Sequence, residues 1–89
     1  MNSKDELKWS NLSTEELYEI AKDEWSKFSM KKLRGLQTWY EGILSDIFSK
    51  FTNNEKCDKI ITENTIRYDA IYNMKMTATF AIDYKNFGE

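Results

Sequence analysis

The alternation of apolar and polar residues between positions 66 and 84 constrains the fold of this chain more than any other feature. Every even position of this stretch is apolar: Ile66, Tyr68, Ala70, Tyr72, Met74, Met76, Ala78, Phe80, Ile82 and Tyr84. Most odd positions are polar, Arg67 and Asp69 among them. A period of two places successive side chains on opposite faces of a strand. The pattern therefore predicts half-buried antiparallel β-structure.

A single straight strand over residues 66–84 would be roughly 60 Å long, too long for a domain of this size. We therefore expect a turn at residues 72–75, where Asn73 tolerates left-handed backbone. Residues 57–63 (CDKIITE) predict a further strand, and residues 52–56 (TNNEK) predict the turn before it.

The N-terminal half carries helix signals instead. Ser13 and Glu16 form a capping box that predicts a helix beginning at Thr14. Its apolar stripe comprises Leu17, Ile20, Ala21, Trp25 and Phe28. A weaker box, Ser3 with Glu6, predicts a short helix over residues 4–9, with Trp9 holding it to the body.

Ser29 is the expected cap of a second, longer helix over residues 30–51. At 100° per residue its core-facing positions fall in one sector. They are Leu33, Leu36, Tyr40, Ile43, Leu44, Ile47 and Phe51, with Met30 and Phe48 widening the sector.

These patterns predict an α+β fold, with two or three N-terminal helices packed on a C-terminal two- or three-stranded antiparallel sheet. The 89 residues are expected to make one small domain. Residues 1–12 would be an arm or short helix, residues 13–51 the helical pair, and residues 57–85 the strands.

The residue types that are absent exclude several chemistries. The chain has no His and a single Cys, Cys57, which removes the Ser-His and Cys-His nucleophile pairs, disulfides within the chain and most metal sites. We expect no enzyme activity, no cofactor and no metal. The apolar runs are too short for a membrane span and the first 15 residues too polar for a secretory signal, so the sequence predicts a cytoplasmic protein.

Two glycines stand in the predicted long helix, although each costs roughly 1 kcal/mol there relative to Ala. Gly35 and Gly42 fall almost opposite the core stripe, in a sector with Thr38 and Ser49 and with Trp39 at its rim. Small residues beside an aromatic ring allow close approach of another backbone. Gly35, Thr38, Trp39, Gly42 and Ser49 are therefore the predicted partner-binding residues. The alternatives are that glycine is merely tolerated on a solvated surface, or that it marks a kink where the helix wraps the core.

A basic cluster, Lys31, Lys32 and Arg34, opens the same helix. These side chains are candidates for contacts with nucleic-acid phosphates. The alternative is that these three residues are ordinary solvated surface charges. The net charge of −2 favours neither nucleic-acid binding nor this alternative.

For function, the sequence favours a non-enzymatic protein-binding module. The chain is small and rich in aromatics, and its 11 Lys against 2 Arg indicate an AT-rich gene of the phage or mobile-element type. We expect an inhibitor or adaptor acting on a host protein, for example in anti-defence. The alternatives are a nucleic-acid-binding accessory protein and a small structural or assembly subunit. A homodimer is expected through the hairpin edge or the Gly35/Gly42 face.

Overall fold

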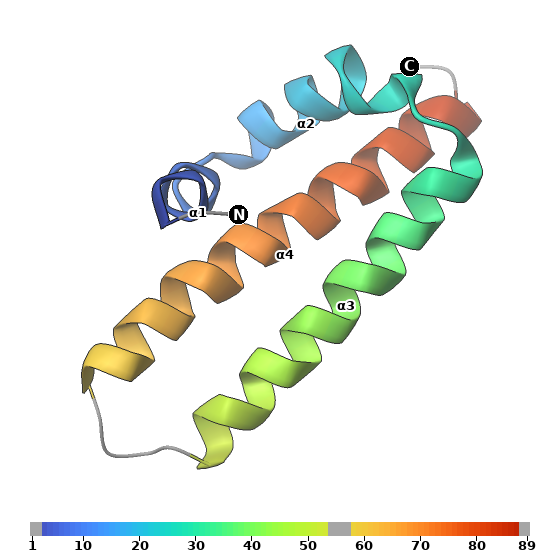
Figure 1. The fold of residues 1–89 in the computed structure, drawn as a ribbon. Helices are drawn as coiled ribbons and strands as arrows, with labels where there is room; N and C mark the ends of the chain where they lie inside the picture. Colours follow the sequence, from blue (N-terminus) through green and yellow to red (C-terminus); the bar gives the residue numbers. More distant parts are fainter. Residues whose placement is uncertain (1–2, 54–57, 88–89) are drawn as a thin grey trace.

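The computed structural model describes residues 3–53 and 58–87, and in those ranges it consists of helices and their connections. The helices are α1 (Ser3–Ser10), α2 (Thr14–Asp23), the 3-10 helix η1 (Trp25–Lys27), α3 (Met30–Asn53) and α4 (Asp58–Phe87). α3 and α4 form a long antiparallel hairpin, and α1 and α2 lie along the other side of α4 (Figure 1). The molecule measures 47 × 21 × 19 Å. The 30-residue α4, about 45 Å long at 1.5 Å per residue, accounts for the long dimension.

The starts of α2 and α3 confirm the predicted caps. At α2 the Glu16 amide donates to Ser13 Oγ (3.2 Å), and the Ser13 amide donates to Glu16 Oε1 (3.0 Å). At α3 the Lys32 amide donates to Ser29 Oγ (3.1 Å). These bonds satisfy amides that have no partner within the first helical turn. The short helix predicted over residues 4–9 is present as α1.

The apolar stripe of α3 also lies largely as predicted. Leu33, Leu44 and Ile47 are buried, and Leu36, Tyr40 and Ile43 are half-buried. Phe48 does not belong to the core, since 61% of it is exposed. The side chain of Phe51 lies outside the described part.

The predicted α+β fold is wrong, because residues 58–87 form α4 and no strand occurs in the described ranges. The buried residues of α4 follow a spacing of three or four: Ala70, Ile71, Met74, Thr77, Ala78 and Ala81. That spacing marks one face of a helix. Ile71 and Ala81 sit at odd positions and break the strict alternation, while the even-numbered Tyr72 is 43% exposed.

The alternation arises because α4 is the central helix. It contacts α1, α2, η1 and α3, so apolar side chains are needed on several of its sides. Phe80, for example, meets Tyr18 of α2 with ring centroids 6.0 Å apart. A helix packed on several sides lacks a single apolar stripe, and its pattern can imitate a period of two. As a helix, residues 66–84 span about 28 Å, which fits the molecule.

The turn and the short strand predicted in the C-terminal half are also wrong, because both lie within a helix. The turn expected at residues 72–75 lies in the interior of α4, and residues 58–63 of the expected short strand belong to the start of α4. α3 continues to Asn53, whereas residues 54–56 and Cys57 lie outside the described residues. A homodimer through the edge of a β-hairpin is therefore no longer proposed, because the described residues form no β-hairpin.

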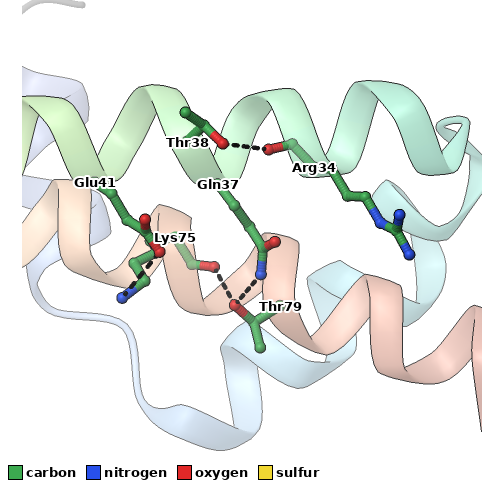
Figure 2. A network of polar contacts seen from close by, with 6 residues as sticks. All are labelled: Arg34, Gln37, Thr38, Glu41, Lys75 and Thr79. Carbon is green, nitrogen blue, oxygen red and sulfur yellow. Dashed lines mark hydrogen bonds and ion pairs between the residues drawn. The ribbon is translucent and has the colours of Figure 1, made fainter.

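A polar network fixes the register of the α3–α4 hairpin (Figure 2). Gln37 Nε2 donates to Thr79 Oγ1 at 2.8 Å, and Thr79 Oγ1 donates to the Lys75 carbonyl at 3.0 Å. Lys75 Nζ lies 3.7 Å from Glu41 Oε1. Gln37 is thus opposite Thr79, and Glu41, one turn later, is opposite Lys75.

Two side chains of α4 hold the N-terminal segments in place. Asn73 Nδ2 donates to the Trp9 carbonyl at the end of α1 (2.8 Å). Lys85 Nζ donates to the Ser26 carbonyl in η1 (3.0 Å). Both carbonyls lie at helix ends, where the regular helical bonds run out; the Trp9 carbonyl also accepts from the Leu12 amide at 3.3 Å. α4 therefore supplies a long-range bond to the end of α1 and another to η1.

Candidate binding groove

A groove of about 340 Å³ lies where α1, α3 and α4 meet. Each of these helices contributes to its lining: Glu6 from α1; Trp39, Tyr40 and Ile43 from α3; Arg67, Ile71 and Met74 from α4. Its volume falls within the range of about 300–1,000 Å³ typical of binding pockets. We therefore treat it as the candidate functional site.

The floor of the groove is apolar and supported from behind. Ile71 and Met74 are buried, and Tyr40 and Ile43 pack against them. Tyr40 stacks on Trp25 of η1, with centroids 6.4 Å apart, and Trp25 in turn lies 5.9 Å from Trp9 of α1. These rings hold Tyr40 in position. Burial raises the pKa of the Tyr40 hydroxyl above its ordinary value.

The rim of the groove presents three large side chains. Trp39 is 67% exposed, Arg67 is exposed and Glu6 is half-buried. Within the described ranges, neither Glu6 nor Arg67 forms an ion pair or a hydrogen bond through its side chain. An indole, a carboxylate and a guanidinium thus surround an apolar floor, one from each helix.

This arrangement offers binding chemistry. The floor can bury an apolar group, the indole adds a wide apolar contact, and the two charges can orient a polar partner. None of the seven described residues that line the groove is Ser, Thr, Cys or Lys.

The predicted glycine strip lies on the solvent face of α3. Gly35, Thr38, Gly42 and Ser49 are all exposed. A Cβ built on either glycine meets no atom within 4 Å. The Thr38 hydroxyl donates to the Arg34 carbonyl at 3.2 Å, so it is partly occupied within its own helix (Figure 2). Only Trp39, among the five predicted partner-binding residues, also lines the groove.

The basic cluster does not form one compact patch. Lys31, Lys32 and Arg34 are all exposed at the start of α3, but at 100° per residue Lys32 points about 160° away from Arg34. The Lys32 ammonium lies 3.9 Å from the centroid of the Phe28 ring, a cation–π contact. Lys32 is therefore already engaged within the chain.

Of the seven lining residues, the sequence predicted only Trp39 as a site residue. Tyr40 and Ile43 were assigned to the core stripe alone, and four residues were missed: Glu6, Arg67, Ile71 and Met74. The last three were missed as site residues because residues 66–84 were assigned to strands. The helical spacing of Ala70, Ile71, Met74 and Thr77 was the available signal. Glu6 carries only the sequence signal of a weak capping box. Nothing in the neighbouring sequence indicates that α1 lies beside the groove.

Three wider observations complete the description of the site. In residues 3–53 and 58–87, no group of three or more His, Cys, Asp or Glu is arranged to hold a metal ion. No helix in the same ranges has the length and apolarity needed to cross a membrane. Comparison of the chain with protein-family models, with curated proteins and with solved structures finds no match.

Proposed function

We propose that this chain is a non-enzymatic protein-binding module whose contact surface is centred on Trp39. The observation that carries the proposal is the 67% exposure of this indole at the rim of an apolar groove. Trp is among the residues most enriched at the energetic centres of interfaces, and an adjacent pocket is the usual setting.

Burial of the exposed Trp39 indole by a partner would contribute a large favourable free energy. A Trp side chain can bury about 250 Å², so the exposed two-thirds of Trp39 corresponds to about 170 Å². At about 25 cal/mol per Å², covering it contributes roughly 4 kcal/mol before the costs of association. The apolar groove beside it extends the surface that a partner would cover.

The proposal also covers the type of action, the cellular location and the oligomeric state of the protein. Action as an inhibitor or adaptor on a host protein, of the phage or anti-defence type, is supported by chain size and residue usage. A cytoplasmic location belongs to the same proposal. The exposed Gly35/Gly42 face remains the proposed route to a homodimer.

A pull-down with three baits tests the proposal. The baits are the parent chain, Trp39→Ala and Phe48→Ala, each presented to nuclease-treated lysate of the cells that express the chain. Phe48 is a matched control, because it is 61% exposed on the same helix. It lies nine residues from Trp39, which is two and a half turns, and so on the opposite side of α3.

The expected result is one dominant protein retained by the parent and Phe48→Ala baits and lost by Trp39→Ala. Alanine at an interface centre costs about 2 kcal/mol or more, which weakens binding roughly 30-fold. Equal retention by all three baits would refute a surface centred on Trp39. A parallel pull-down from untreated lysate is the reference: a protein retained there but absent after nuclease treatment would favour the nucleic-acid alternative.

A further inference from the structure

Two opposite charges face an apolar groove without pairing with each other. Glu6 of α1 and Arg67 of α4 both line the groove, and Tyr40, Ile43, Ile71 and Met74 form its apolar floor. Because the two groups form no ion pair, each keeps capacity for a charged partner. An occupant that satisfies both walls must carry a basic group, an apolar group and an acidic group.

The shape of the fold around the groove favours a helix as the carrier of these groups. α1 and α2 cover only part of the α3–α4 hairpin, and the hairpin continues beyond α1 toward its closed end (Figure 1). The groove lies at the point where that cover stops, since it includes Glu6 of α1. A helix laid there would extend the α1–α2 layer by ordinary helix-to-helix packing.

We propose that the groove seats one face of an amphipathic helix from a partner protein, with a large apolar side chain on the floor, a basic residue at Glu6 and an acidic residue at Arg67. This inference rests on the proposed function and adds the chemistry of the partner. Trp39 flanks the floor and covers the apolar anchor. The charges select the partner and its direction along the groove, because a helix carrying only one sign of charge would face repulsion on one wall.

Synthetic peptides serve as the probe. Five 14-residue amphipathic helical peptides share one aromatic anchor. Two carry Lys on one flank and Glu on the other, in opposite orders; the remaining three carry only Lys, only Glu, or only Gln. Each is titrated into the ¹⁵N-labelled full chain, and the indole N–H signal of Trp39 reports occupancy of the groove.

Glu6→Gln and Arg67→Gln remove the wall charges one at a time. Asp69→Asn is the control, because Asp69 is exposed and lies 200° around α4 from Arg67.

One mixed-charge peptide is expected to bind about tenfold more tightly than the peptide that carries only Gln. Glu6→Gln should weaken only peptides that contain Lys, and Arg67→Gln only those that contain Glu, by about three- to fivefold each. Asp69→Asn should change nothing.

Two results would overturn the inference. If all five peptides shift the Trp39 signal with equal affinity, the charges select nothing, while the protein-binding function stands. If no peptide shifts it at about 1 mM, an amphipathic helix is not the occupant, and the pull-down with Trp39→Ala still tests the function separately. A Trp39 signal that moves with protein concentration alone would assign the groove to a second copy of the chain and would likewise overturn it.

Discussion

Neighbouring residues Ile71 and Tyr72 provide a direct solution test of the all-helical fold. In α4, Ile71 is 4% exposed and Tyr72 is 43% exposed. In an alternating strand the burial of the two would be reversed. We therefore compare the free energy of unfolding of Ile71→Ala with that of Tyr72→Ala.

The expected costs follow from the contacts. Ile71→Ala removes three buried carbon atoms, worth about 0.8 kcal/mol each, and the cavity left between α3 and α4 raises the loss to about 3 kcal/mol. Tyr72 stacks on Tyr68 with centroids 6.4 Å apart, and the Lys75 ammonium lies 6.0 Å from its ring centroid. Because Tyr72 is 43% exposed and these contacts are only partly shielded from solvent, Tyr72→Ala should cost about 1 kcal/mol.

Thermal and urea unfolding followed by circular dichroism provide the assay. For a domain of this size, a loss of about 3 kcal/mol lowers Tm by roughly 12–24 °C, against roughly 4–8 °C for Tyr72→Ala. Domains of this length have a total stability of only about 4–13 kcal/mol. Ile71→Val, with an expected cost of about 1 kcal/mol, therefore keeps the comparison measurable if Ile71→Ala does not fold. A larger loss for Tyr72→Ala than for Ile71→Ala would refute the placement of both residues.

Four further predictions address the helix ends and the glycine strip. Ser13→Ala should destabilise by about 1 kcal/mol in urea melts, because it removes the cap of α2; superimposable melts would contradict this. Hydrogen bonds from Ser13 hold the pKa of Glu16 below its usual value, so their stabilisation is present above the unfolded pKa and is lost as pH falls through the folded pKa. Melts across that acid range should show a smaller pH dependence for Glu16→Gln. Gly42→Ala should be neutral or stabilising by up to about 1 kcal/mol and Gly42→Gln should stay folded, since the space beside Gly42 is open; unfolding of either would place the strip in the core. Asn73→Ala should cost about 1 kcal/mol and speed amide exchange in α1, because it removes the side-chain bond that links α4 to the Trp9 carbonyl, and unchanged exchange would show that the bond does not hold α1.

Features determined by neighbouring residues could be predicted from the sequence. The Ser13–Glu16 box and the Ser29 cap act within one helical turn, so the starts of α2 and α3 follow from a few residues each. The core stripe of α3 could be predicted because this helix buries one side only. Its exposed face, with Gly35 and Gly42, follows from the same periodicity.

Only the tertiary structure decided what residues 58–87 become. Their apolar side chains serve α3 on one side and α1, α2 and η1 on others, so the pattern reflects several neighbours at once and not one helical stripe. The buried odd positions, Ile71 and Ala81, carried the helical signal, but strict alternation around them obscured it.

The candidate groove could not be predicted either, because its lining residues lie far apart along the chain. Trp39 was predicted as a contact residue because the helical wheel put an aromatic beside small residues. Its neighbours Glu6 and Arg67 lie 33 and 28 residues away along the chain, and only the packing of α1 and α3 against α4 brings them to one site. Local sequence determines where these helices start, whereas long-range packing determines which of their faces meet.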